Sequence, residues 1–159
     1  MAIHFLDSSA IVKHYFQEQG HDWVEAIHDP TTGHELYISE AALVEVVASI
    51  CRKAREQDIP VEVRDATIGD FRQDIDSIYN VRLVDRALYT TAGNLCRSHR
   101  LRAYDAVQLA CAIAVRNEAL AVKSPEAKFS EFAFVSGDLK LLSIAIAEGF
   151  RVENPNNYS

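Results

Sequence analysis

Short apolar runs alternate along this chain with longer segments of helical character, and this alternation restricts the folds that the chain can adopt. The apolar runs predict strands at residues 2–7, 35–38, 78–84, 132–136 and 151–153. Strands of this length that alternate with helices are typical of an α/β domain with a mostly parallel sheet. We therefore expect an α/β fold in which helices cover the sheet.

The segments between the expected strands carry recognisable helix signals. Ser8 or Ser9 could cap the first helix, Ser39 a long third helix to about residue 57, and Asp85 a later one. Glu40 would then lie in the first turn of the third helix, where a carboxylate suits the helix dipole. The expected helices cover residues 8–18, the stretch between Gly20 and Pro30, and residues 39–57, 61–76, 85–97, 104–118 and 138–148.

Length and composition bound the function classes. A chain of 159 residues fits one domain, which we place at residues 1–153, with residues 154–159 as a C-terminal tail. No apolar run approaches the ~20 residues needed to span a bilayer, and no signal-peptide pattern opens the chain, so we expect a cytoplasmic protein without a membrane segment. The net charge of −7 argues against a broad basic face for nucleic acid and favours a basic protein partner.

Four acidic residues are embedded in apolar sequence, where an isolated carboxylate is costly. They are Asp7, Glu45, Asp105 and Asp138. A buried carboxylate costs several kcal/mol unless a cation or hydrogen-bond donors compensate it. Asp7 and Asp138 follow expected strands, so parallel strands would bring them to one edge of the sheet, where such folds bind ligands. One pocket holding a hard divalent cation, Mg²⁺ or Mn²⁺, would account for all four acids.

Each acid also has a simpler explanation. Asp7, Asp105 and Asp138 lie near expected helix starts and could serve only as caps. Glu45 is expected in the middle of a helix, with no Lys or Arg three or four residues away, so it would need a distant Arg or another partner.

A basic cluster precedes Asp105. It contains Arg97, His99, Arg100 and Arg102. These residues could form a solvated helix end, where cations suit the dipole. Alternatively, Arg97, Arg100 and Arg102 could contact RNA phosphates beside the acids.

The order of these motifs resembles that of PIN-domain ribonucleases, and in particular VapC-like toxins of toxin–antitoxin systems. The similar segments are residues 6–13, 39–45, 102–110, 134–142 and 148–155. The resemblance implies a three-layer α/β/α PIN-like fold and a Mg²⁺- or Mn²⁺-dependent endoribonuclease. It also implies a homodimer that a cognate antitoxin with a basic tail holds inactive.

Carried over by motif position, the resemblance makes Asp7, Glu45, Asp105 and Asp138 the catalytic and metal-binding acids. Ser9 and Ser136 would be polar neighbours that support them. The chain departs from the family pattern at residues 123–131, a longer and more polar segment than expected before the last central strand.

Two other functions remain open from the sequence. Asp7, at the end of the first strand, could form an aspartyl-phosphate in a phosphotransferase of haloacid-dehalogenase-like type, although such enzymes have a second Asp where this chain has Ser9. The chain could also be a non-catalytic PIN-like domain that binds protein.

Overall fold

The computed structural model describes residues 2–121 and 131–159. Its centre is a five-stranded sheet in the order β3-β2-β1-β4-β5, in which all four strand pairs are parallel. The strands are β1 (Ala2–Leu6), β2 (Glu35–Ser39), β3 (Asn80–Arg82), β4 (Glu131–Val135) and β5 (Arg151–Glu153). The expected α/β class and parallel sheet are therefore confirmed.

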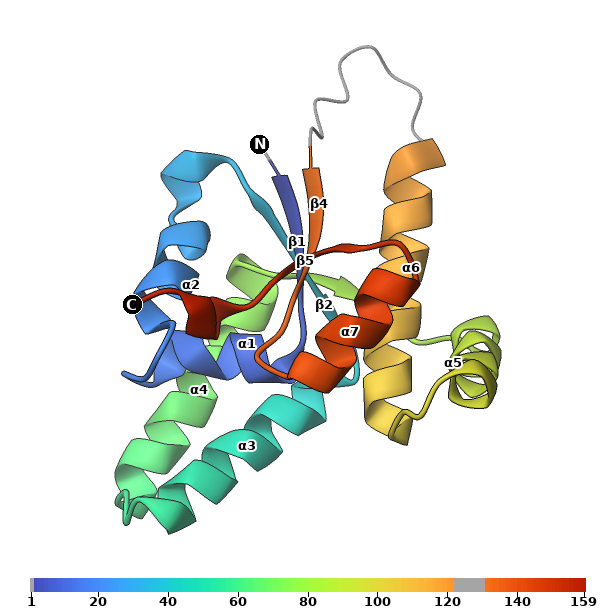
Figure 1. Ribbon diagram of the computed structural model, residues 1–159. Coiled ribbons are helices and arrows are strands. Elements are labelled where there is room, and N and C mark those ends of the chain that lie inside the picture. Colours follow the sequence, from blue (N-terminus) through green and yellow to red (C-terminus); the bar gives the residue numbers. More distant parts are fainter. Residues whose placement is uncertain (1, 122–130) are drawn as a thin grey trace.

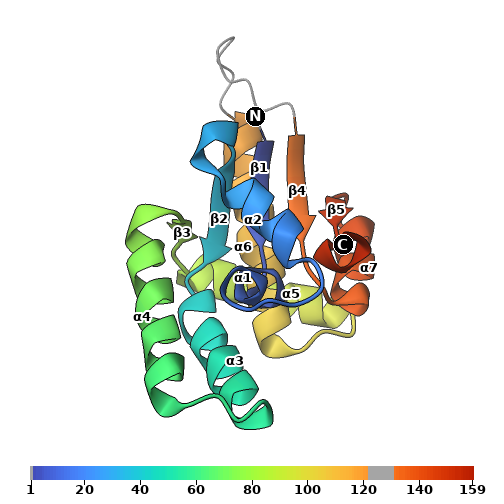
Figure 2. The ribbon, with the colours of Figure 1, turned by 90° about the vertical axis from the view of Figure 1, so that its left-hand side faces the viewer.

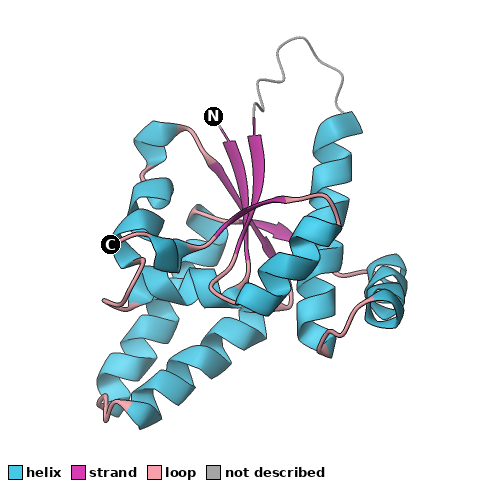
Figure 3. Ribbon diagram, viewed as in Figure 1, coloured by secondary structure: helices cyan, strands magenta, loops and turns pink. Residues whose placement is uncertain are grey.

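Helices cover both faces of the sheet (Figures 1 and 3). They are α1 (Ser8–Tyr15), α2 (His21–His28), α3 (Ala42–Glu56), α4 (Val61–Ser77), α5 (Arg86–Ser98), α6 (Ala103–Ala121) and α7 (Leu139–Ala147). Figure 2, a view turned by 90°, shows α3 and α4 extending together from one side of the sheet. Within the described residues, no helix combines the length and the apolar character needed to cross a membrane.

The sheet separates two apolar cores, one under each helical layer. Phe5 and Phe134 stack with their ring centroids 5.9 Å apart and pack with buried side chains of α5, α6 and α7. The next residues along the two strands, Leu6 and Val135, point to the opposite core, formed with α1 to α4. Because β1 and β4 are covered on both faces, they consist of continuous apolar runs rather than alternating ones. The helical layers on either side complete the three-layer α/β/α arrangement.

The start of α3 differs from the prediction. Ser39 does not cap this helix but ends β2, where its Oγ accepts a hydrogen bond from the backbone N–H of Ala41 (3.1 Å). Glu40 lies before the helix, and its carboxylate accepts a hydrogen bond from the N–H of Val84 (2.8 Å). The helix begins at Ala42, because Ser39 still belongs to β2 and Glu40 is bonded to Val84, in the segment that follows β3.

The first helix also differs at both ends. Its N-cap is Asp7 rather than Ser8 or Ser9, and it ends at Tyr15 instead of residue 18. Lys13 accounts for the early end, because its ammonium donates hydrogen bonds to Glu18 (3.1 Å) and to the carbonyl of Gln19 (2.8 Å), which hold the chain in a turn. The polar segment expected at residues 123–131 lies outside the described residues except for Glu131, which begins β4.

The C-terminal residues return to α2. Tyr158 stacks on Trp23 with centroids 5.0 Å apart, and the side-chain amide of Gln19 donates a hydrogen bond to the carbonyl of Tyr158 (2.6 Å). Gly20 makes this approach possible, since it adopts a φ of +84° and lies directly against the backbone of Pro155.

We predict that Gly20→Ala lowers the free energy of unfolding by about 1–3 kcal/mol, because a Cβ there would be strained at positive φ and would lie 2.4 Å from the Pro155 carbonyl oxygen. Gly69→Ala is the matched control. Its Cβ would meet nothing within 4 Å in α4, so it should gain up to about 1 kcal/mol of helix propensity. Urea unfolding of both variants checks this, and equal stabilities would show that the Pro155 contact is unimportant.

Candidate active site

The pairing of β1 with β4 places the polar residues that follow both strands side by side. The two strands run in parallel register from Ala2 opposite Glu131 to Leu6 opposite Val135. One step further, the backbone N–H of Asp7 donates to the carbonyl of Val135 (3.1 Å). The chain therefore leaves the sheet with Asp7 and Ser136 adjacent at its carboxyl edge.

Asp7 is held by three donors in a buried position. Its Oδ1 accepts hydrogen bonds from Ser9 Oγ (2.7 Å) and from the N–H of Ala10 (3.0 Å), and its Oδ2 accepts one from Ser136 Oγ (2.7 Å). Burial nevertheless raises the pKa of Asp7 to about 6, because the desolvation of the carboxylate outweighs these hydrogen bonds. Ser9 and Ser136 thus contact Asp7, in the position of supporting residues.

Glu45 lies in the first turn of α3, not in the middle of a helix as predicted. Gln108 donates from its amide to Glu45 Oε1 (3.3 Å) and to Ser8 Oγ (2.9 Å), which ties α3 and α6 to the start of α1. No Arg or Lys forms an ion pair with Glu45 within the part of the chain that the structure describes. Burial raises the pKa of Glu45, and the hydrogen bonds from Gln108 and Ser8 only partly offset this shift.

Asp105 and Asp138 share one cation, Arg102. The Arg102 guanidinium lies 3.2 Å from Asp105 Oδ2 and 4.0 Å from Asp138 Oδ2. Its side chain is 82% exposed, so solvent screens both ion pairs and their net contribution to stability is small. Asp138 also caps α7 by accepting from the N–H groups of Lys140 and Leu141, as its simpler explanation predicted. Asp105 lies within the first turn of α6, which begins at Ala103, and so is not at the N-cap position.

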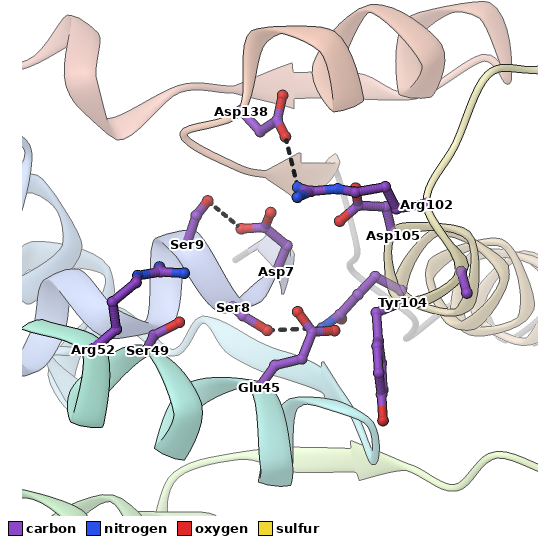
Figure 4. Close-up of a pocket in the computed structure, with 12 residues that line it drawn as sticks. Asp7, Ser8, Ser9, Glu45, Ser49, Arg52, Arg102, Tyr104, Asp105 and Asp138 are labelled. Carbon is purple, nitrogen blue, oxygen red and sulfur yellow. Dashed lines mark hydrogen bonds and ion pairs between the residues drawn. The ribbon is translucent and has the colours of Figure 1, made fainter.

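All four acids line one cavity of about 360 Å³ at the carboxyl edge of the sheet (Figure 4). The cavity is also lined by Ser8, Ser9, Ser49, Arg52, Arg102, Ala103, Tyr104 and Gln108. The acids come from four separate segments: Asp7 after β1, Glu45 from α3, Asp105 from α6 and Asp138 after β4. The structure therefore brings together the acids that the sequence singled out.

The donor chemistry of the cavity fits a hard divalent cation. Within residues 2–121 and 131–159, no three His, Cys, Asp or Glu side chains lie so that they could hold a metal ion as they stand, so the acids would have to move together to bind one. The available donors are oxygens, the type that Mg²⁺ and Mn²⁺ prefer. Gln108 Oε1 is buried without a hydrogen-bond partner among the described residues, which leaves an unused oxygen beside Glu45. Burial raises the pKa values of Asp7 and Glu45, and a cation bound beside them would lower both.

The residues of the predicted basic cluster do not all lie beside the acids. Arg100 and Arg102 line a smaller cavity beside Asp105 and Asp138, whereas Arg97 does not line either acid-bearing cavity and lies exposed near the end of α5. Arg52 was missed by the sequence reasoning. It lies on α3 seven residues after Glu45, two helical turns along the same face, and that spacing is the signal that could have found it.

The family model of the PIN domain matches residues 4–135. This chain belongs to the PIN domain family. Its fold is similar to that of a chain in the crystal structure of VapBC2 from Rickettsia felis bound to a DNA fragment from their promoter (15% identity, TM-score 0.59). That match covers 96% of this chain and 98% of the other. No curated protein matches the chain.

Two further PIN-like matches show the same fold. One is a chain of FitAcB from Neisseria gonorrhoeae, with 14% identity and a TM-score of 0.62, covering 96% of this chain and 97% of the other. The second is a chain of FitAB bound to an IR36 DNA fragment, with 11% identity and a TM-score of 0.64, covering 98% and 97%. These likenesses extend over nearly the whole chain and therefore beyond the family match, which ends at residue 135.

We predict that Asp7→Asn stabilises the metal-free protein increasingly as the pH rises. The folded-state pKa of about 6 lies above the unfolded value of 3.8, so the native state of the wild type binds more protons and loses stability between about pH 4 and pH 6. Asn keeps the oxygen that caps α1 but cannot ionise. The variant should therefore gain roughly 3 kcal/mol over the wild type above pH 7 and little of this at pH 4.

Urea unfolding in EDTA across this pH range measures the effect. Asp85→Asn is the control, since Asp85 caps α5 in the same way but is exposed. A stability difference for Asp7→Asn that stays constant from pH 4 to pH 7 would contradict the assignment.

Proposed function

We propose that this chain is a divalent-metal-dependent endoribonuclease and the toxin of a toxin–antitoxin pair. PIN domains are generally metal-dependent nucleases. The observation that carries the proposal is the convergence of Asp7, Glu45, Asp105 and Asp138 on one cavity at the carboxyl edge of a parallel sheet. Like-charged groups converge in this way at a cost, which a bound cation would offset.

Asp7, Asp105 and Asp138 would hold Mg²⁺ or Mn²⁺, with Glu45 as a direct ligand or as a partner of bound water. Such a cation supplies activated water at neutral pH and stabilises negative charge on a phosphodiester. Ser9 and Ser136 fix the orientation of Asp7. Its Oδ1 accepts two hydrogen bonds and its Oδ2 only one, so Oδ2 keeps a lone pair to which a cation could bind. The rigid β1–β4 edge thus holds the most buried ligand in place before any substrate arrives.

Arginine side chains around the acids would bind the RNA backbone. Arg102 spans Asp105 and Asp138 at the surface, and Arg100 lines the adjoining cavity. Arg52 is exposed on the α3 side and lacks an ion pair among the described residues. Arg guanidinium groups match phosphate oxygens, so these three residues would draw the strand across the acids. Arg97, which lies on α5 away from the cavity, would contact only a more distant phosphate.

An antitoxin with a basic tail would complement the acidic cavity. The chain carries 23 acidic and 16 basic residues, and the excess of acids favours a cationic partner over unspecific nucleic-acid binding. The similar structures are those of VapBC2 and of FitAB, each bound to a DNA fragment. These likenesses support a protein partner of the antitoxin type for this chain. We further propose that the toxin is a homodimer.

An aspartyl-phosphate phosphotransferase is less consistent with the site. Asp7 is only 5% exposed, whereas a nucleophilic carboxylate oxygen must reach the phosphorus atom of its substrate, and the position two residues later holds Ser9 instead of a second Asp. No observation favours a purely protein-binding domain, and the experiment below separates it from the nuclease.

We predict that the purified protein cleaves total RNA at discrete positions with Mg²⁺ or Mn²⁺ and not with EDTA. Asp105→Asn should lower the rate by at least about 100-fold, because it weakens a direct metal ligand. Asp85→Asn, at an exposed cap outside the cavity, should leave the rate unchanged. Sequencing of the RNA ends provides the measurement.

Unchanged metal-dependent cleavage by Asp105→Asn would overturn the site assignment. An absence of cleavage by folded wild-type protein, freed of any copurified inhibitor, would favour the protein-binding domain.

A further inference from the structure

A second cavity adjoins the acidic one and differs from it in chemistry. It has a volume of about 290 Å³ and lies between α5 and α6. Tyr89 from α5 and Tyr104 from α6 line it, and both are exposed, by 60% and 53%. Ala103 and Tyr104 line both cavities, so the two spaces share a wall.

The lining of this slot is apolar and mostly small. Its buried residues are Ala92, Ala106 and Val107. Gly93 leaves open space on the α5 side, because a Cβ built there meets nothing within 4 Å. No charged side chain lines the slot among the described residues, so it suits an uncharged group rather than a phosphate.

The order of residues along the chain links the slot to the acids. Arg102 reaches Asp105 and Asp138, and Tyr104, two residues later, stands at the rim of the acidic cavity with its ring directed away from these carboxylates (Figure 4). Residues 102–104 therefore place the Arg102 guanidinium over the acids and the Tyr104 ring beside them. A nucleotide presents the matching pair, a phosphate joined through its sugar to a base.

We propose that this slot binds one unstacked nucleobase of single-stranded RNA, which stacks on Tyr104 while its phosphate lies over the acidic cavity. The inference rests on the proposed nuclease function. Single-stranded RNA is commonly held by stacking of splayed bases on aromatic side chains. The nucleobase is favoured over a protein side chain because Ala103 and Tyr104 line both the slot and the acidic cavity, over which the phosphate of the same nucleotide would lie.

The probe is a 12-nucleotide single-stranded RNA around a cleavage position mapped for the wild type, together with copies that each lack one base. For the wild type, one abasic position next to the cleaved bond should lower kcat/KM by roughly 5- to 150-fold, the range expected for the loss of one base–aromatic stack. Tyr104→Ala should lower kcat/KM on the intact RNA by a similar factor and should no longer respond to that abasic position. Tyr104→Phe keeps the ring and should stay within about twofold of the wild type.

A second variant tests the slot itself without removing the aromatic ring. Gly93→Leu should fill the open space and reduce kcat/KM as Tyr104→Ala does, while a Leu in place of Gly should not weaken the helix. Gly69→Leu is the matched control, since Gly69 is also an exposed helical glycine with open space around its Cβ. It should leave kcat/KM unchanged.

The outcomes are distinct. If the wild type cuts RNA but Tyr104→Ala and Gly93→Leu retain the full response to every abasic position, the slot does not bind a base and only this inference fails. If these variants instead change the oligomeric state in sedimentation and leave cleavage unchanged, the slot is a contact between copies of the chain. If the wild type cuts no RNA, the proposed function itself fails.

Discussion

The parallel pairing of β1 with β4 is the interaction on which the site depends. It brings Asp7 and Ser136 together at the end of the sheet and buries the Asp7 carboxylate among apolar strands. The cost of that burial is visible in the raised pKa of Asp7, about 6 against 3.8. Under the proposed function, a buried acid that the sheet holds in place would be a preorganised metal ligand, because a bound cation would recover the lost charge stabilisation.

Arg102 shows how the remaining charge is balanced at the surface. Its guanidinium lies between Asp105 and Asp138 and is mostly exposed, whereas Asp7 and Glu45 have hydrogen-bond donors but no ion pair among the described residues. The cation is therefore shared by two of the four acids and not by the other two. A surface arginine can rotate at little cost, so under the proposed function the same side chain could pair with the acids and then with a substrate phosphate.

The sequence predicted the layout of this fold better than its details. The apolar runs of β1 and β4 predicted a parallel sheet. The positions of Asp7 and Asp138 directly after strands predicted that both lie at one edge of that sheet. The start of α3 could not be predicted, because Ser39 and Glu40 make hydrogen bonds within the strand connections that local cap preferences do not anticipate. Because α3 begins at Ala42 rather than near Ser39, Glu45 lies in its first turn and not in its middle.

Contacts between distant segments were the other part that local patterns could not supply. Gln108 donates hydrogen bonds to Ser8, 100 residues away in the chain, and to Glu45, 63 residues away. The residues around Gln108 do not predict either partner. The basic cluster before Asp105 was visible as a run of charges, yet only the path of α5 and α6 decides that Arg102 faces the acids and Arg97 does not.

The central claim is that these four carboxylates form a cation site, and crystals grown with Mn²⁺ test it most directly through anomalous scattering. The account predicts an anomalous peak in the cavity, within coordinating distance of Asp7 and Asp105. Asp138 should contact the ion directly or through a bound water molecule. A cavity without such a peak, with the Arg102 guanidinium still placed between Asp105 and Asp138, would contradict it.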